Sequence, residues 1–171
     1  MQTLSKMIKC EIVKLEQFSG SKASIYSVVL AGETQTLLDK FISENIILYK
    51  SETKNILERL IAIGHNVGAR VNFFKRGEGN PGDGLCALYD NPNSKLRLYC
   101  IRYGSQIIIV GGGGEKPKNI RTLQESDKLK EENYLLRELS GQITNRIKEK
   151  EIQFSNDSLN FIGDLAFDEE Y

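Results

Sequence analysis

The sequence predicts an α+β fold: a two-helix hairpin packed on a twisted, mainly antiparallel sheet, followed by a C-terminal helix and an acidic extension. Two observations carry this prediction. Short apolar segments rich in β-branched residues occur before residue 31 and again between residues 71 and 110. Apolar residues at helical spacing fill the stretch between them and recur after residue 128. A chain of 171 residues, 40% of them hydrophobic, suffices for one core, so we expect a single domain over residues 1–150 and an acidic tail over 151–171.

The first third of the chain predicts two strands and the helical hairpin. Residues 9–15 and 23–30 favour strands, and the turn-like FSGSK separates them. Residues 32–49 follow with an apolar stripe at helical spacing: Leu37, Leu38, Phe41, Ile42 and Ile46. A second helix fits residues 51–64, with Ser51 as its cap. These helices are expected to cover one face of a sheet.

The middle of the chain predicts an antiparallel meander. After a short strand at 71–74, the segments LCALYD, LRLYCIRY and IIIV are separated by breaks short enough for hairpins. In LRLYCIRY, alternation assigns Leu96, Leu98 and Cys100 to a core face and leaves Arg97, Tyr99, Ile101 and Tyr103 on the other. Arg97 between aromatic residues on an open sheet face would suit the floor of an RNA groove. The alternative is a solvated arginine packed on its aromatic neighbours.

Four consecutive glycines, Gly111–Gly114, end the last predicted strand. They do not match a Walker A loop, because the spacing to Lys116 is wrong and Pro117 stands where serine or threonine is needed. A dinucleotide loop is also excluded, since such a loop follows the first strand of a parallel βαβ unit. Glycine at the end of a central strand indicates a bulge or a close backbone approach. We expect either a neighbouring element to pack there, or an RNA backbone or the chain's own tail to lie against it.

The last part of the chain predicts one long helix, followed by a segment whose structure the sequence leaves open. Thr122 and Glu125 have the spacing of a capping box, and leucine and isoleucine recur at helical spacing to about residue 150. Gly141 should weaken this helix by roughly 1 kcal/mol relative to alanine. The segment from residue 154 mixes aromatic and acidic residues, which fits either a loosely docked tail or an extra hairpin.

Charge and cysteine content narrow the class of protein. The formal net charge is zero, yet residues 1–150 carry 23 basic and 17 acidic residues, whereas 151–171 carry six acidic and no basic ones. A basic body fits nucleic-acid binding and also an ordinary soluble domain. Cys10, Cys86 and Cys100 lack metal-ligand spacing, which predicts core thiols in a reducing compartment and no metal or cofactor. Without a secretory or membrane-spanning segment, the chain is expected in the cytoplasm.

An ordered series of motifs over roughly residues 23–135 resembles the RelE/HigB-like toxin family. GLCALY at 84–89 is similar to the family's G-L-x-E-L-R strand, and LRLY at 96–99 to its hydrophobic-R-hydrophobic-Y strand. GSQIIIV at 104–110 is similar to its turn and long apolar strand, and GEKPK at 114–118 to its basic exit. The resemblance implies a RelE-like fold for the domain.

The resemblance also implies an activity. Members of the family are mRNA interferases that usually depend on the ribosome. They are neutralised by antitoxin proteins, and some of these antitoxins are of helix-turn-helix type. Cleavage by attack of the RNA 2′-hydroxyl on the adjacent phosphate needs cations at the phosphate, a proton acceptor and a proton donor. Arg97 would hold the phosphate, while Lys116 and Lys118 would stabilise developing charge or supply a proton. The expected RNA-binding residues are Tyr99 and Tyr103, which could stack a base, with Lys75, Arg76, Arg102 and Arg121.

The chain departs from the family pattern on one strand. The E-L-R triplet is replaced by Ala87-Leu88-Tyr89, so its glutamate and arginine are both missing. Two functions therefore remain open: an mRNA endoribonuclease of a toxin–antitoxin module, or a catalytically degenerate RelE-like protein that binds protein or RNA without cleaving it. A stand-alone domain unrelated to toxins is a third alternative.

Overall fold

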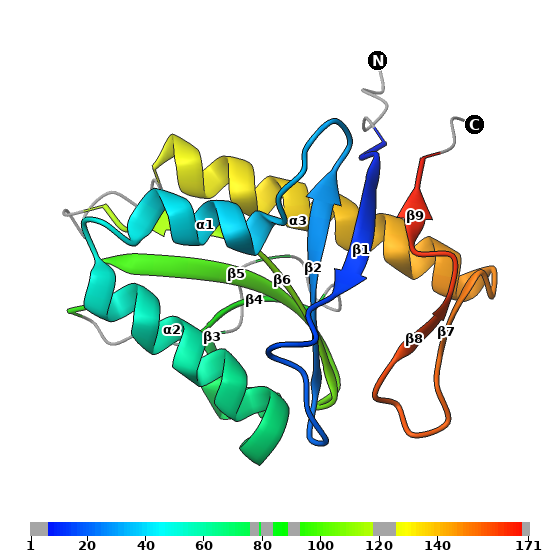
Figure 1. The fold of residues 1–171 in the computed structure, drawn as a ribbon. Helices are drawn as coiled ribbons and strands as arrows, with labels where there is room; N and C mark the ends of the chain where they lie inside the picture. The colour runs from blue at the N-terminus through cyan, green and yellow to red at the C-terminus, as the bar shows by residue number, and fades with distance from the viewer. Residues whose placement is uncertain (1–6, 76–78, 80–83, 89–92, 118–125, 169–171) are drawn as a thin grey trace.

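The computed structural model of the chain describes residues 7–75, 79, 84–88, 93–117 and 126–168. It is a mixed α+β structure in which helices cover both faces of a mostly antiparallel sheet (Figure 1). Helices α1 (Leu37–Asn45) and α2 (Lys50–Ala62) lie on one face, and α3 (Asp127–Lys148) crosses the other. The expected helical hairpin and C-terminal helix are confirmed.

The described strands form a seven-stranded sheet with the order β3-β4-β5-β6-β2-β1-β9. Only the β2–β6 pair is parallel among these strands, and it brings Ser24 opposite Ile107 at the centre of the sheet. The bounds of the strands are β1 Cys10–Lys14, β2 Ser24–Leu30, β3 Phe74–Lys75, β4 Leu85–Leu88, β5 Leu96–Tyr103, β6 Ile107–Glu115 and β9 Ala166–Phe167. The predicted antiparallel meander corresponds to β4, β5 and β6.

Alternation along the strands divides the core into two clusters, one on each face. In β5, Leu98 and Cys100 pack towards the helical hairpin, with Phe41 of α1 and Leu60 of α2. Tyr99 and Ile101 point the other way, into a cluster that includes the apolar side of α3. The predicted division of β5 into two faces is therefore confirmed, but the face that carries Tyr99 is covered by a helix.

The helix ends differ from the predicted ones in their caps. The Thr36 hydroxyl accepts a hydrogen bond from the Asp39 amide at 3.0 Å and so caps α1. Helix α2 begins one residue before Ser51 and has no side-chain cap, so the predicted serine cap is wrong. Ser126 caps α3 by accepting from the Leu129 amide, whereas the capping box at 122–125 lies outside the described residues. The segment predicted as a strand at 71–74 is mainly the 3-10 turn Val71–Phe73.

The acidic C-terminal segment is built into the fold. Strands β7 (Ile152–Phe154) and β8 (Phe161–Gly163) form a hairpin, which favours the second of the two expectations for this segment. Strand β9 then returns to the sheet and pairs with β1, with Phe167 opposite Cys10. The predicted boundary at residue 150 therefore does not separate a loose tail from the domain, because Phe167 is fully buried in the core.

All three cysteines are buried thiols. Burial raises the pKa of Cys10 to about 11, while the Arg146 charge opposes that shift. Burial, with neighbouring Cys86, also raises the pKa of Cys100 well above its usual value. Because the thiolate is the reactive form, we expect Ellman's reagent to leave all three thiols unmodified in the native protein at pH 8 and to modify three after unfolding.

The same shift predicts a pH dependence of stability. The pKa of Cys10 is higher in the folded state, so its contribution is complete below the ordinary pKa of 9.0 and is lost as the pH rises towards about 11. The free energy of unfolding should fall in this window by up to about 1.4 kcal/mol per pH unit for this thiol. A Cys10→Ala variant should show a shallower alkaline decline in urea titrations. An equal decline in both proteins would contradict the assignment to Cys10.

Candidate functional site

Two of the three expected catalytic residues lie at the same end of the sheet. Arg97, near the start of β5, is paired with Gly114, and Lys116 lies just beyond the end of β6. The backbone amide of Lys116 donates to the Lys95 carbonyl at 2.7 Å, and its Nζ donates to Ser94 Oγ at 3.0 Å. We call Lys95, Arg97 and Lys116 the basic end. Lys118 lies outside the described residues, as do Arg76 and Arg121.

The expected RNA-binding residues do not join this group. Tyr99 has no exposed surface, so it is not positioned to stack on a base. Arg102 and Tyr103 lie at the opposite end of β5, about 17 and 20 Å from Arg97 at 3.4 Å per residue. Lys75 is exposed on the edge strand β3, three strands from β6.

Arg102 and Tyr103 have structural contacts of their own. Arg102 Nε donates to the Ala69 carbonyl at 2.7 Å and so fixes the loop after α2. The Tyr103 ring packs against Phe154 and Phe161 of the β7–β8 hairpin, with ring centroids 6.1 and 5.4 Å away. These contacts explain why both residues occupy β5 without requiring RNA. The expected groove of alternating arginine and aromatic side chains is therefore not assembled on one open surface.

The glycine run explains why the Arg97 face is closed. The β5–β6 register shifts between Leu98 and Cys100, so β6 carries one extra residue there, and the predicted bulge is confirmed. A Cβ atom on Gly111 would lie 2.5 Å from Leu136 of α3, and one on Gly114 would lie 3.1 Å from the Lys128 side chain. Helix α3 is therefore the neighbouring element that packs against the glycines, in the position that RNA or the chain's tail was expected to take as the alternative.

Separating helix α3 from the sheet would require a large free energy. Leu129, Leu136, Leu139 and Ile143 of α3 have no exposed surface. Burying a side chain of this size contributes about 1.5–3 kcal/mol, so the four together contribute about 6–12 kcal/mol. A typical domain has a total stability of about 5–15 kcal/mol. Lifting α3 from the sheet would therefore cost about as much as unfolding the protein.

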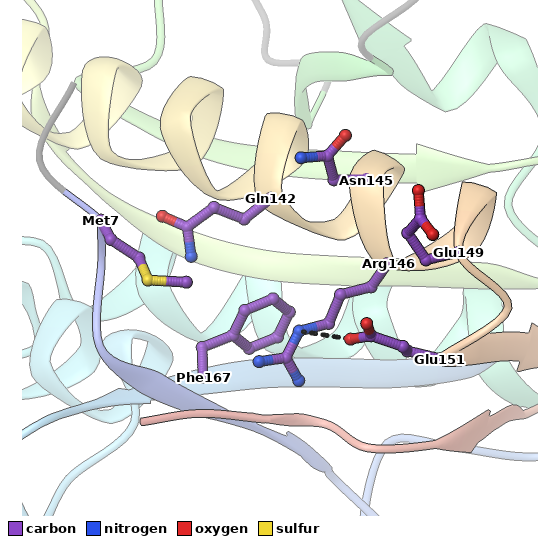
Figure 2. Close-up of a pocket in the computed structure, with 7 residues that line it drawn as sticks. All are labelled: Met7, Gln142, Asn145, Arg146, Glu149, Glu151 and Phe167. Carbon is purple, nitrogen blue, oxygen red and sulfur yellow. Dashed lines mark ion pairs between the residues drawn. The ribbon is translucent and has the colours of Figure 1, made fainter. Parts of the chain in front are cut away.

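A second candidate site lies at the other end of α3, around Arg146 (Figure 2). It is a cleft of about 340 Å³ between the C-terminal half of α3, strand β9 and Met7. The Arg146 guanidinium packs over the Phe167 ring, 3.8 Å from its centroid, and Glu151 faces its Nε at 3.7 Å. We call this the Arg146 cleft.

Arg146 also protects an edge of the sheet. Its Nη1 donates to the carbonyls of Asp164 and Ala166 at 2.9 and 2.8 Å. The Leu165 carbonyl between them accepts from Ile12 of β1, so the two carbonyls that Arg146 binds point away from the sheet. Without Arg146, these two carbonyls would be unpaired acceptors on an edge strand, available for pairing with another chain. The sequence signal for this role is the position of Arg146, which continues the apolar stripe of Leu139 and Ile143.

Comparison with protein-family models, curated proteins and solved structures gives no match to the chain. Among the described residues, no group of three or more histidine, cysteine, aspartate and glutamate side chains is placed to hold a metal ion. No helix in the described part of the chain is both long and apolar enough to cross a membrane. The basic end and the Arg146 cleft are thus the two surfaces from which a function is argued.

Proposed function

We propose that the protein is a RelE-like binding module that contacts RNA or protein through its basic end without cleaving RNA. The order of its elements supports the RelE-like part: a strand, a two-helix hairpin and an antiparallel meander. The observation that carries the non-catalytic part is the position of α3. It covers the sheet face on which the interferase reaction would need Arg97 and Tyr99 together.

The chemistry of the basic end supports the same conclusion. Cleavage needs a group that accepts the 2′-hydroxyl proton next to the cations that hold the phosphate. Glu115 is the carboxylate nearest in the strand, but it pairs with Leu96, whose side chain packs on the face of the helical hairpin. A hydrogen bond from Tyr49 to Glu115 raises the pKa of Tyr49 and places Glu115 with α2. The sheet thus separates Glu115 from Arg97, whereas the Glu132 carboxylate of α3 lies beside Gly112 and pairs with Lys128 at 2.8 Å.

Cations remain useful for binding. Lys95 is exposed and Arg97 is half-buried, and three positive side chains at one sheet end favour contact with a phosphate backbone over contact with a neutral surface. Nearby Lys128 pairs with Glu132 at 2.8 Å and with Glu44 at 3.4 Å. RNA is therefore the partner that the basic end favours, and a protein partner with an acidic surface is the alternative.

A second candidate function is the mRNA endoribonuclease of a toxin–antitoxin module, with an antitoxin protein and mRNA, on or off the ribosome, as partners. One observation favours it: Arg97 and Lys116, expected to act together at the scissile phosphate, come to the same end of adjacent strands. The two functions differ in whether expression of the protein creates new RNA ends.

Inducible expression of the wild type beside Arg97→Ala/Lys116→Ala, with mapping of mRNA 5′ ends, tests both. We expect equal growth of the two strains and no new ends, because α3 closes the catalytic face. Growth arrest with new ends in the wild type alone would establish the endoribonuclease instead. Circular dichroism of both purified proteins controls for folding.

Binding is measured separately by fluorescence anisotropy with a single-stranded RNA oligomer. The double variant should bind more weakly, and the slope of log K against log salt should fall by about 1.4, at about 0.7 per lost phosphate contact. Lys148→Ala, at the far end of α3, is the matched control and should leave the slope unchanged. An unchanged slope in the double variant would rule out RNA contact by the basic end.

A further inference from the structure

The Arg146 cleft is independent of the basic end. Arg146 lies 18 residues after Lys128 on α3, which is about 27 Å along the helix axis at 1.5 Å per residue. At about 340 Å³, the cleft falls within the range of small-molecule sites, which begins at about 300 Å³. Met7 gives it an apolar side, the buried Phe167 ring lies beneath the Arg146 guanidinium, and Gln142 contributes to its wall (Figure 2).

Arg146 presents hydrogen-bond donors of its guanidinium group to this cleft. The residue is only 7% exposed, and its Nη1 is occupied by two backbone carbonyls. Within the described residues, Nη2 donates no hydrogen bond, and the contact of Nε with Glu151 is long, at 3.7 Å. An oxygen of a ligand placed at Nη2 would gain a charge-assisted hydrogen bond. The planar guanidinium fits a carboxylate well.

The charges around the cleft restrict the ligand further. Glu151 and Asp164 already balance the Arg146 charge, with ion-pair distances of 3.7 and 3.4 Å. Glu149, exposed at the rim, adds a further negative charge. A simple anion would be repelled by these carboxylates, whereas a ligand that also carries an ammonium group would pair with Glu149 or Glu151. Gln142 is committed to the Ile8 backbone, so it holds the wall in place.

We propose that the Arg146 cleft binds a small zwitterion with a carboxylate and an ammonium group, the chemical class of the free amino acids. The carboxylate accepts from Arg146 Nη2, the ammonium group faces Glu149 and Glu151, and an apolar side chain lies on Met7. This site is separate from the basic end, where RNA or protein binding is proposed. Either proposal can therefore be disproved without affecting the other.

The test is NMR titration of the full-length protein with each of the common amino acids up to about 10 mM, which detects a Kd of about 1 mM. We expect at least one apolar amino acid to shift the amide signals of residues 142–151 in a saturable manner. The matching amine without the carboxylate, and the matching acid without the amine, should each bind at least about tenfold more weakly. No saturable shift with any amino acid, or equal binding of the acid alone, would overturn the proposal.

Variants separate binding from folding. Arg146→Ala is expected to destabilise the protein, so Glu149→Gln is the decisive change, since this exposed side chain has no other partner in the described residues. It should weaken binding of the zwitterion about two- to fivefold, as expected for loss of one exposed ion pair. Glu131→Gln, exposed on the same helix but outside the cleft, should leave the affinity unchanged. Equal affinities of the two variants would overturn the assignment of the ammonium group to Glu149.

Discussion

Replacing Gly113 with alanine is expected to lower the free energy of unfolding by about 3 kcal/mol or more. A Cβ atom at this position would overlap the backbone carbonyl oxygen of Arg97 and lie 3.0 Å from the Cα atom of Leu98. Both atoms belong to the backbone of β5, so no side chain can move aside. Relief requires strand β6 to shift away from β5 at the bulge, where α3 packs on the other residues of the glycine run.

Gly141→Ala is the matched control for this change. Gly141 is exposed within α3, and a Cβ atom there has nothing within 4 Å. Alanine should therefore stabilise the protein by about 0.5–1 kcal/mol through its higher helix propensity. The same substitution thus has opposite signs at two positions. A loss below about 1 kcal/mol for Gly113→Ala in urea unfolding, within the ordinary range for point variants, would contradict the close strand contact.

Arg146→Ala is expected to cost about 2–4 kcal/mol. The change removes two charged hydrogen bonds to the Asp164 and Ala166 carbonyls and the contact with the Phe167 ring. It also leaves the Glu151 and Asp164 carboxylates without their shared cation. Both carboxylates are partly exposed to water, which places the cost below that of a fully buried ion pair.

Urea unfolding and hydrogen exchange check this prediction in two ways. The global stability should fall, and the amides near the opened edge, residues 164–167, should lose most of their protection. Lys148→Ala, two residues further along and exposed, should change stability by less than about 0.5 kcal/mol. Equal stabilities of the two variants would show that Arg146 does not support β9.

The strands and helices of the chain could largely be predicted from the periodicity of apolar residues. Which element covers each face of the sheet could not be predicted in this way. Alternation in β5 separates Leu98 from Tyr99 whatever covers each side. Tyr99 and Ile101 are apolar enough for a covered face, and Arg97 and Tyr103 polar enough for an open one. Only the position of α3 decides between these, and the residues that connect β6 to α3 carry no pattern that fixes it.

The functional residues were harder to predict for a related reason. Arg97 and Lys116 are brought together because β5 and β6 form a hairpin, which short-range sequence signals predict well. The contacts of Arg102 and Tyr103 depend on segments far away in the sequence, the loop at Ala69 and the β7–β8 hairpin. Arg146 could not be predicted because its partners, the carbonyls of Asp164 and Ala166, lie 18 and 20 residues further along the chain.

The parallel pairing of β2 with β6 sets the order in which the chain can fold. The buried hydroxyl of Ser27 donates to the Val110 carbonyl at 2.8 Å across 83 residues of sequence. Closing a loop of this length costs about 3 kcal/mol more than closing a four-residue hairpin. Neighbouring strands joined by hairpins can therefore form first, and the two halves of the sheet join late. The β2–β6 pair at the centre of the sheet can therefore form only when residues on both sides of the helical hairpin are present.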